Sequence, residues 1–384
     1  MQLEHFLEQK PLFYDEIDYE RMPKIYASIQ SHFTLPKIIH VIGTNGKGTT
    51  GRFLAQMLHA NALRVGHYTS PHILRFNERI WINGADVDDE VLDVYHLRLS
   101  TWLEPSMADS LSYFEYTTLL AMAIFCDYCD YVVLEAGLGG EHDATAIFPK
   151  ILSVVTPIGL DHQAFLGNSI EEIAHTKLNS LTTQCVLSKQ YSDAVYSIAL
   201  EKTEALHVKL YRVENYFDAC WSEKIDQFVA QFKFSSFLKE NFTTALCALK
   251  VLGYDISLEF FSPTVLRGRC QKILPNVTMD VGHNEMAADA LCKAFDGKKV
   301  VLIYNSYKDK DYPTILKRLK PIIEEILVIA IQSPRAVEEA ALYNVAHELN
   351  LPISSFTTLQ DDKEYLVFGS FSVVEAFLKV LGER

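Results

Sequence analysis

One short stretch of the chain carries the residue types that hold phosphate groups. It reads HVIGTNGKGTTGR and covers residues 40–52. Glycines let backbone N–H groups approach phosphate oxygens, and a helix N-terminus adds partial positive charge. Lys47 adds a full charge, and Thr49 or its neighbour offers a hydroxyl to Mg²⁺. The spacing departs from the usual P-loop, because only two residues separate Gly43 from Gly46 and another glycine follows the lysine.

The elements around this loop fit a nucleotide site. KIIHVIG (37–43) is apolar enough for a buried strand, and residues 47–61 have the pattern of a helix. A strand, a glycine turn and a helix together predict an ATP site, and the alternative is a tight turn that binds nothing. Kinases, GTPase-like switches and ATP-driven ligases share this part, so the neighbouring segments must decide the reaction.

Polar side chains follow three further apolar runs. Glu135 lies inside YVVLEAG (131–137), where a carboxylate is costly unless it is paired or bound to metal. Asp161 and His162 follow ILSVVT (151–156), and Ser70 begins a polar segment after another presumed strand. The alternatives are a satisfied structural glutamate and solvated loops. Oxygen and imidazole ligands for a divalent cation at the ATP phosphates would come from Thr49, Ser70, Glu135 and His162.

Composition limits the class of protein. The chain has 384 residues, which is enough for two domains. Hydrophobic residues make up 49% of it and charged residues 22%, a composition that predicts a sizeable core. The net charge of −14, without a basic run, argues against broad nucleic-acid binding but leaves room for a small anionic substrate. The start, MQLEHFLEQK, lacks an apolar signal region, and no apolar run could span a bilayer. We therefore expect a cytoplasmic protein without membrane contact.

The seven cysteines do not suggest a disulfide framework. Cys126 and Cys129 form one CxxC pair, but no second pair or nearby histidine completes a zinc site. We interpret both as buried or incidental residues.

Strand-like and helix-length segments alternate, which predicts a P-loop, doubly wound, mostly parallel α/β domain. Helices are expected at 89–103, 115–128, 169–181, 192–205 and 240–252. A second alternating series predicts a smaller Rossmann-like α/β domain, with strands at 277–282, 299–304 and 325–330 and helices at 284–295 and 334–349. The glycines and prolines of 253–275 mark the boundary. We assign 1–268 to an ATP-binding central domain and 269–384 to a C-terminal glutamate-ligase domain.

Two strand-like runs near the end lie close together in sequence. PISSF (352–356) and EYLVFG (364–369) are separated by about seven residues, fewer than a parallel crossover needs. Either they are not neighbouring parallel strands, or one of them is not a strand.

The motifs, in their order, resemble the folylpolyglutamate synthase / dihydrofolate synthase family of Mur-type ATP-dependent amide ligases. The resemblance covers nearly the whole chain and rests on GTNGKGTT (43–50), TSPHILRFNERI (69–80), YFEYTTLLA (113–121), LEAGLGGEHDAT (134–145), VVTPIGLDHQAFLG (154–167), RGRCQ (267–271), DVGHN (280–284), DKD (309–311) and GSF (369–371). The short phosphate loop is the form typical of this family.

The resemblance implies a role for each matching residue. Nucleotide contacts fall on Gly43, Asn45, Gly46, Lys47, Gly48, Thr49, Thr50, Asn241, Arg269 and Asp280. Magnesium ligands fall on Ser70, Glu135 and His162, besides Thr49. The pterin substrate is expected near Phe114, Glu115, His142 and Asp143, and the incoming glutamate near His283 and Ser370. Catalytic roles fall on Lys47, His162, Lys177, Asp280 and His283.

The implied cofactors are ATP and Mg²⁺. Lys177 matches a lysine that is carbamylated in the family, and the carbamate would hold a second Mg²⁺; a monovalent cation is also allowed. Arg75, Arg79 and Arg269 are expected to meet the anionic substrates, with surface salt bridging as the alternative. The partners are dihydropteroate or folate, L-glutamate and ATP, and a monomer is expected.

Three positions depart from the family pattern. Glu141 follows GLGG where the family often has arginine, which reverses a charge beside the expected pterin pocket. Lys177 lies in HTKLNSL rather than the usual sequence. The 357–363 connection has no room for a helix found in longer members.

The chemistry implied is phosphorylation of a substrate carboxylate by ATP, followed by attack of the glutamate amine on the acyl phosphate. Closure of a two-domain cleft would exclude water from that intermediate. A cell-wall precursor ligase is a rival, but only 42 residues precede Gly43, too few for its extra domain. A nucleotide switch has no need of Glu135 or His162. We favour the bifunctional dihydrofolate synthase / folylpolyglutamate synthase over a monofunctional folylpolyglutamate synthase, although the motifs do not separate them.

Overall fold

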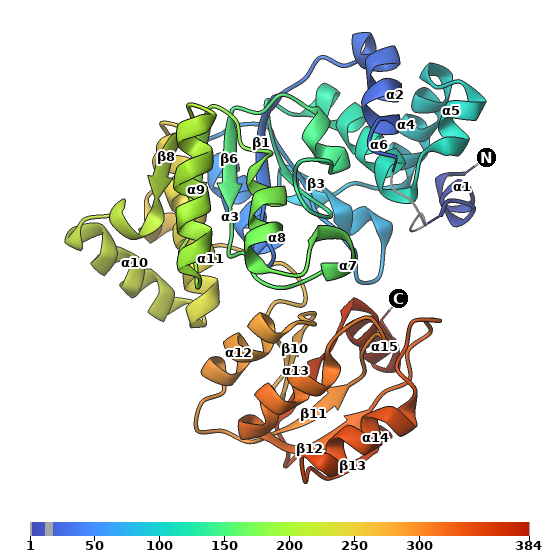
Figure 1. Ribbon diagram of the computed structural model, residues 1–384, viewed down its shortest axis with the longest axis vertical. Coiled ribbons are helices and arrows are strands. Elements are labelled where there is room, and N and C mark those ends of the chain that lie inside the picture. The colour runs from blue at the N-terminus through green and yellow to red at the C-terminus, as the bar shows by residue number, and fades with distance from the viewer. Residues whose placement is uncertain (1, 12–17, 384) are drawn as a thin grey trace. The chain divides into compact units, whose positions relative to one another are not determined.

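The computed structural model describes residues 2–11 and 18–383, which divide into two compact units (Figure 1). The first unit comprises residues 1–70, 76–232 and 240–264, and the second comprises 71–75, 233–239 and 265–384. The division near 264 falls within the predicted boundary region 253–275. The segments 71–75 and 233–239 also belong to the second unit, and no feature of the sequence predicts this. The ligand role assigned to each domain stays a prediction.

An eight-stranded sheet organises the first unit, in the order β4-β3-β2-β5-β1-β6-β7-β8. Its strands are β1 (Lys37–Ile42), β2 (Val65–Tyr68), β3 (Ile80–Ile82), β4 (Ala85–Asp86), β5 (Tyr131–Glu135), β6 (Leu152–Val155), β7 (Gln184–Leu187) and β8 (Lys209–Arg212). Only β3 and β4 run antiparallel to their neighbours, at one edge. The strand order reverses around β1, which lies between β5 and β6 and marks the switch point where such sheets bind ligands.

Helices cover both faces of this sheet (Figure 1). They are α1 (Leu3–Glu8), α2 (Arg21–Ile29), α3 (Lys47–Ala60), α4 (Asp89–Trp102), α5 (Pro105–Ser110), α6 (Tyr113–Tyr128), α7 (Gln163–Leu166), α8 (Ile170–Leu178), α9 (Asp193–Ala205), α10 (Ala219–Gln231) and α11 (Ser236–Val251). Ile38, Val132 and Leu134 pack with α6 on one face. On the other face, Gly51 of α3 lies against Val133. Alternate residues of each strand thus enter opposite cores, which explains why β5 is buried throughout.

A six-stranded sheet organises the second unit, in the order β13-β12-β11-β14-β10-β9. Its strands are β9 (Gln271–Leu274), β10 (Val277–Asp280), β11 (Val300–Tyr304), β12 (Ile323–Val328), β13 (Ile353–Ser355) and β14 (Tyr365–Phe368). Its helices are α12 (Glu285–Ala294), α13 (Tyr312–Leu319), α14 (Glu339–Glu348) and α15 (Phe371–Val380). Helices α12, α13 and α14 pack on one face of the sheet, and α15 packs on the other.

The two strand-like runs near the end are both strands, but they are not neighbours. β13 pairs with β12 at the edge, whereas β14 lies in the centre between β10 and β11. The short connection is possible because it crosses to a different part of the sheet rather than joining adjacent parallel strands. The predicted helix at 334–349 is too long, since α14 begins at Glu339. Among the described residues, no helix is long and apolar enough to cross a bilayer.

Candidate active site

The phosphate loop connects β1 to α3 at the switch point of the first sheet. Gly43 and Gly46 have φ values of 139° and 84°, which side chains rarely adopt. A Cβ on Gly43 would lie 2.0 Å from Oγ1 of Thr156, and one on Gly46 would lie 2.4 Å from Oδ1 of Asn241. Both glycines are therefore required by conformation and by space. The second contact also places Asn241, a predicted nucleotide contact, directly against the loop.

The lysine and threonines of the loop occupy different environments. The Lys47 ammonium donates hydrogen bonds to the carbonyl oxygens of Gly43 and Thr44, at 3.2 and 3.1 Å. The side chains of Thr49 and Thr50 are buried, and their hydroxyl oxygens have no hydrogen-bond partner among the described residues. A buried hydroxyl without a partner is costly, and a cation or a phosphate oxygen at the helix start would relieve that cost. The threonines fit the predicted metal and nucleotide roles.

Glu135 ends β5 next to the phosphate loop. Its side chain is 4% exposed, and its Oε2 accepts hydrogen bonds from the Thr69 hydroxyl and from the Ser70 backbone N–H, the latter at 3.2 Å. The register pairs Glu135 with Val41 of β1. The structure thus brings Glu135 and Ser70 together beside the end of β1. A buried carboxylate and a serine at one place offer the hard oxygen ligands that Mg²⁺ prefers.

The loop after β6 bears the predicted histidine. The hydroxyl of Thr44 donates to the Gly159 carbonyl and accepts from the Gly159 N–H, both at 3.0 Å, which fastens this loop to the phosphate loop. The His162 backbone has φ of 50°, and its N–H donates to Asp161 Oδ1 at 2.9 Å. This left-handed backbone conformation determines the direction in which the Cα–Cβ bond of His162 leaves the chain.

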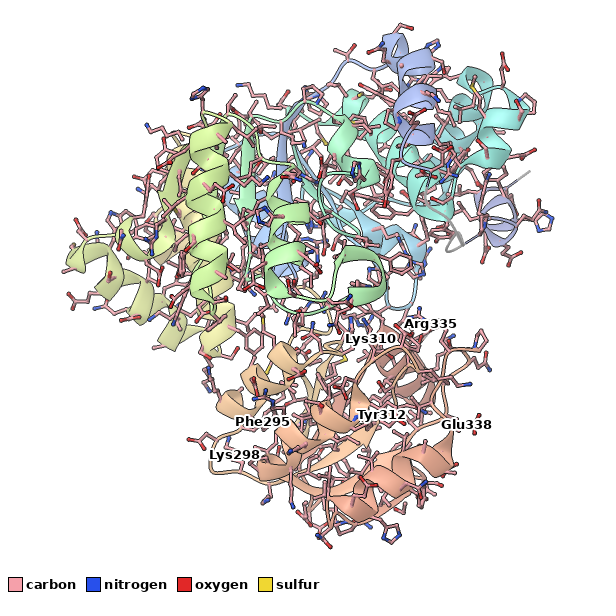
Figure 2. All side chains as sticks on the ribbon, viewed as in Figure 1. Phe295, Lys298, Lys310, Tyr312, Arg335 and Glu338 are labelled. Carbon is pink, nitrogen blue, oxygen red and sulfur yellow. The ribbon has the colours of Figure 1, made fainter. Side chains whose placement is uncertain are left out.

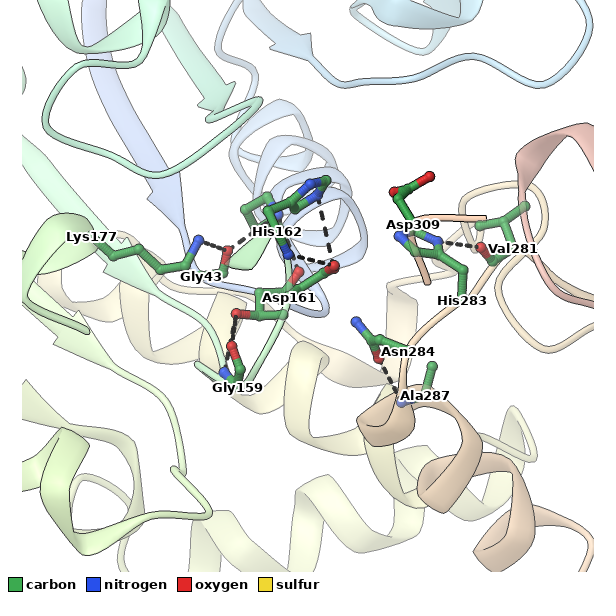
Figure 3. A network of polar contacts seen from close by, with 12 residues as sticks. Gly43, Gly159, Asp161, His162, Lys177, Val281, His283, Asn284, Ala287 and Asp309 are labelled. Carbon is green, nitrogen blue, oxygen red and sulfur yellow. Dashed lines mark hydrogen bonds and ion pairs between the residues drawn. The ribbon is translucent and has the colours of Figure 1, made fainter. Parts of the chain in front are cut away.

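Lys177 of α8 reaches the phosphate loop from outside it. Its ammonium donates to the Gly43 carbonyl at 2.9 Å, and the side chain is almost fully buried (Figure 3). Burial and the nearby charge of Lys47 lower the pKa of Lys177 to about 7. With this pKa a substantial fraction of the Lys177 side chain is a neutral, nucleophilic amine near pH 7, which is the form that reacts with carbon dioxide.

The glycine turn after β5 packs between an aromatic ring and α8. A Cβ on Gly137 would lie 2.6 Å from the ring of Phe114. A Cβ on Gly140 would lie 2.7 Å from the Lys177 carbonyl. The predicted pterin residue Phe114 therefore lies directly against the turn. His142, on the same turn, lies 4.2 Å from the ring centre of Tyr19.

Two carboxylates shape this turn. Burial raises the pKa of Asp143, whose carboxylate accepts from the Leu138 N–H at 2.7 Å and the Thr145 N–H at 2.9 Å. The unexpected Glu141 accepts from the side-chain amide of Asn179 at 2.6 Å. Both carboxylates are engaged by the protein itself, so they hold the loop in place.

Glu115 has a structural partner that sequence reasoning missed. Together with Ser112 it forms a capping box at the start of α6, and it makes an ion pair with Arg21 at 2.9 Å. No local signal could reveal Arg21, because it lies far away in the sequence. Helix capping and pairing account for the burial of Glu115.

The second unit gathers its predicted residues at one edge of its sheet. Asp280 ends β10 and accepts from the N–H groups of Cys270 and Gly282, at 2.8 and 2.7 Å; burial raises its pKa, against the opposing charge of Arg269. Ser370 caps α15 directly after the neighbouring strand β14. His283 follows β10, with Nδ1 3.2 Å from the Val281 carbonyl (Figure 3).

Two further charged residues belong to the second unit. Arg75 lies in its 71–75 segment rather than in the first unit. Asp309, of the DKD motif, pairs with the guanidinium of Arg335 through contacts of 2.8 and 2.9 Å. Sequence reasoning missed Arg335.

The fold and the loop at its switch point define a P-loop nucleotide-binding protein of the α/β class. No protein-family model matches the chain. A dihydrofolate synthase/folylpolyglutamate synthase of Haemophilus influenzae is 30% identical, over 95% of this chain and 94% of that protein. The solved folylpolyglutamate synthetase of Helicobacter pylori is 37% identical with a TM-score of 0.80, over 100% of this chain and 98% of that one.

Two other solved structures carry ligands. The E. coli FolC protein in complex with DHPP and ADP is 26% identical with a TM-score of 0.84, over 100% of this chain and 98% of that one. A bifunctional folylpolyglutamate synthase/dihydrofolate synthase with Mn, AMPPNP and L-glutamate bound is 26% identical with a TM-score of 0.81, over 99% and 97%.

The chain belongs to the dihydrofolate synthase/folylpolyglutamate synthase family. The predicted family, the two-domain α/β fold and the ATP-dependent ligase class are confirmed. The bifunctional assignment is confirmed at the level of the family, in which three relatives that cover most of the chain carry that name.

Proposed function

We propose that this chain joins L-glutamate to dihydropteroate and to folates in an ATP-dependent reaction. One observation carries the proposal. The phosphate loop, the Glu135–Ser70 pair and Lys177 converge at the switch point of one parallel sheet. A nucleotide switch would have no use for a buried lysine amine that is bonded to its phosphate loop. The names of the relatives, and the DHPP, nucleotide and L-glutamate bound in two of them, support the substrates.

The phosphate loop would hold ATP through the helix N-terminus and Lys47. Thr49, Ser70, Glu135 and His162 would hold Mg²⁺, and the unpartnered hydroxyl of Thr49 fits that role. Bound Mg²⁺ neutralises charge on the phosphate oxygens. The manganese in a relative supports a divalent cation at such a site.

The reaction has two steps, a phosphoryl transfer and an acyl transfer. The substrate carboxylate oxygen attacks the γ-phosphorus of ATP, the bond to the bridging oxygen breaks, and ADP leaves. The amine of glutamate then attacks the acyl carbon, phosphate leaves with the bonding electrons, and the nitrogen loses a proton. Lys47 would counter the charge of the transferring group. Asn241, Arg269 and Asp280 would position the nucleotide.

The second unit would receive the incoming amino acid, with 269–384 as the glutamate domain and 1–268 as the ATP domain. The Val281 carbonyl can only accept a hydrogen bond, so Nδ1 of His283 carries the proton and Nε2 is the basic nitrogen. That nitrogen would meet the amine of glutamate, and Ser370 would meet its carboxylate. Arg75 would add positive charge for the anionic substrates.

The pterin would lie at the glycine turn. Phe114 presents a ring against Gly137, and His142 lies on the same turn. Glu115 and Asp143 would act by fixing the helix start and the loop around the pterin, since their carboxylates are bonded within the protein.

Carbamylation of Lys177 is part of the proposal. Its pKa of about 7 supports it, because a neutral amine is required for the attack on carbon dioxide. The carbamate would be an anionic oxygen ligand for a second Mg²⁺. A monovalent cation, the monomeric state and a cytoplasmic location stay predictions.

A phosphate-release assay tests the proposed function. Release should require ATP, L-glutamate and a pteroate-type substrate together. Release with ATP alone, or with a nucleotide-sugar, would overturn it. Parallel arms with dihydropteroate and with tetrahydrofolate separate the bifunctional enzyme from a monofunctional folylpolyglutamate synthase, the alternative that the name of the Helicobacter pylori relative favours.

A further inference from the structure

A groove of about 590 Å³ lies on the second unit, and none of its lining residues is among those assigned above to the reaction. One lining residue, Cys270, donates its backbone N–H to Asp280. Its lining includes four lysines from three separate segments: Lys233, Lys272, Lys298 and Lys299. Glu364 is the single carboxylate among the described lining residues. Figure 2 marks Phe295 and Lys298, which follow the last turn of α12.

A second depression continues the first. It measures about 600 Å³, shares Lys298 and Lys299 with the groove, and adds Lys293 and Asp296 to its lining. Five lysines therefore line one continuous track, opposed by two carboxylates. We call these two joined depressions the lysine track.

Three of the five lysines that line the track have no carboxylate partner among the described residues. In the part of the chain that the structure describes, no carboxylate makes an ion pair with Lys233, Lys272 or Lys298. The chain as a whole carries a net charge of −14, so an accumulation of unpaired lysines runs against its composition. Neighbouring like charges repel one another, and a bound polyanion removes that repulsion.

The track is separate from the predicted glutamate residues of the same unit. Val300 begins β11 and Glu364 directly precedes β14, so the groove reaches the N-terminal ends of these strands. Asp280 and Ser370 lie at the C-terminal ends of β10 and β14, which are parallel. Parallel strands put their two ends at opposite edges of a sheet, so the track is a different site.

The shape and charge of the track favour an extended chain of single charges over a compact phosphate. Helix α12 ends at Ala294 in the groove wall, and a helix C-terminus carries partial negative charge, the reverse of a phosphate site. The lysines are spread over two joined depressions rather than focused on one point. Half-buried Phe234 and Phe295 line the groove and would contact the methylenes of such a chain.

We propose that the lysine track binds the γ-linked oligoglutamate chain of a folate polyglutamate, the product class of this enzyme. Each added glutamate contributes one carboxylate and two methylenes, which match lysines interspersed with aromatic rings. The identity of the chain rests on the proposed function, whereas the charge of the track does not.

Binding to the whole protein tests this directly. Isothermal titration with γ-linked peptides of one to six glutamates, without ATP or pterin, should give a Kd that falls with each added residue. In the double variant Lys272→Gln/Lys298→Gln, the Kd for the hexaglutamate should rise about tenfold, and added salt should weaken binding less than in the parent. The KM values for ATP and L-glutamate should stay unchanged, since neither lysine belongs to the predicted active site.

A matched control removes the same charge elsewhere in the unit. Lys317→Gln/Lys379→Gln changes two exposed lysines on α13 and α15, and should leave the Kd within twofold of the parent. Equal effects of the two double variants, or a Kd independent of chain length, would overturn the proposal. Tighter binding of inorganic tripolyphosphate than of the hexaglutamate would overturn the oligoglutamate assignment. Failure of the ligase assay with chain-length-dependent binding intact would reject the proposed function alone.

Discussion

Lys177 and Gly43 are joined by a 2.9 Å hydrogen bond from the lysine ammonium to the glycine carbonyl, across 134 positions of sequence. The same carbonyl accepts from Lys47 at 3.2 Å. Two lysines therefore meet one backbone oxygen of the phosphate loop. Their mutual repulsion and the burial of Lys177 both favour an uncharged amine on Lys177.

The first prediction concerns stability against pH. The pKa of Lys177 falls from an ordinary 10.5 to about 7 on folding, so between these values the unfolded chain binds more protons. The free energy of unfolding gains a positive slope with pH in that window. Relative to Lys177→Met, which cannot titrate, the parent should become more stable from pH 7 to 10, by about 3.5 kcal/mol. Denaturant unfolding at several pH values measures this, and parallel curves for the two proteins would contradict it.

The second prediction concerns carbamylation. Parent enzyme purified without bicarbonate should regain activity when bicarbonate is added, because the neutral amine of Lys177 takes up carbon dioxide. Lys177→Arg should show no such response and should lose at least about tenfold in kcat/KM. Intact-protein mass measurement under mild conditions provides a readout that is independent of activity. Full activity of Lys177→Ala would reject the idea.

The third prediction compares two glycines whose positive φ values are nearly equal, 84° for Gly46 and 86° for Gly253. Gly46→Ala should raise the KM for ATP about tenfold or more, because the new Cβ would lie 2.4 Å from the Asn241 amide oxygen and distort the loop. Gly253, with φ of 86°, has nothing within 4 Å of the corresponding position. Gly253→Ala should therefore cost only about 1 kcal/mol of stability and leave the KM for ATP unchanged. Similar kinetic effects of both substitutions would show that backbone strain alone is responsible.

The fourth prediction concerns the divalent cation. Glu135→Gln keeps the size of the side chain and its hydrogen bond to the Ser70 N–H, but removes the negative charge. The affinity of the protein for Mn²⁺ in the presence of ADP, followed by electron paramagnetic resonance, should fall at least about tenfold. Glu204→Gln, on the exposed surface of α9, is the control with the same chemical change. Unchanged Mn²⁺ affinity in the Glu135 variant would remove Glu135 from the metal site.

The fifth prediction separates structure from substrate contact at Glu115. Loss of its ion pair and capping box should lower the stability of Glu115→Ala by about 3 kcal/mol. A double-mutant cycle with Arg21→Ala should reveal a coupling free energy of at least about 1 kcal/mol. A large rise in the KM for dihydropteroate without a loss of stability would instead assign direct substrate contact to Glu115.

The sequence predicted the central strands of both sheets and most of the helices that connect them. β1, β5, β6 and β11 are mainly apolar and buried on both faces, and such runs are visible without a structure. The strands β3, β4, β7, β8 and β9 were not predicted, because each has only two to four residues and includes partly or fully exposed positions. The candidate site residues at the strand ends could be proposed for a physical reason, since a polar side chain after a buried strand must lie at the sheet edge.

Long-range partners could not be predicted. Arg21 for Glu115 and Asn179 for Glu141 depend on tertiary packing, which no local pattern encodes. The burial of Lys177 against the loop has the same origin. The segments 71–75 and 233–239 join the second unit through packing alone, although the surrounding sequence belongs to the first.

Helix α8 touches the phosphate loop through Lys177 and the glycine turn through Gly140, and the Thr176 carbonyl accepts from the Glu141 N–H at 3.2 Å. The nine residues of α8 therefore support both of these loops at once. The proposed function assigns the phosphate loop to ATP and the glycine turn to the pterin. Because α8 contacts both, substitutions in α8 should alter the kinetics for ATP and for the pterin together.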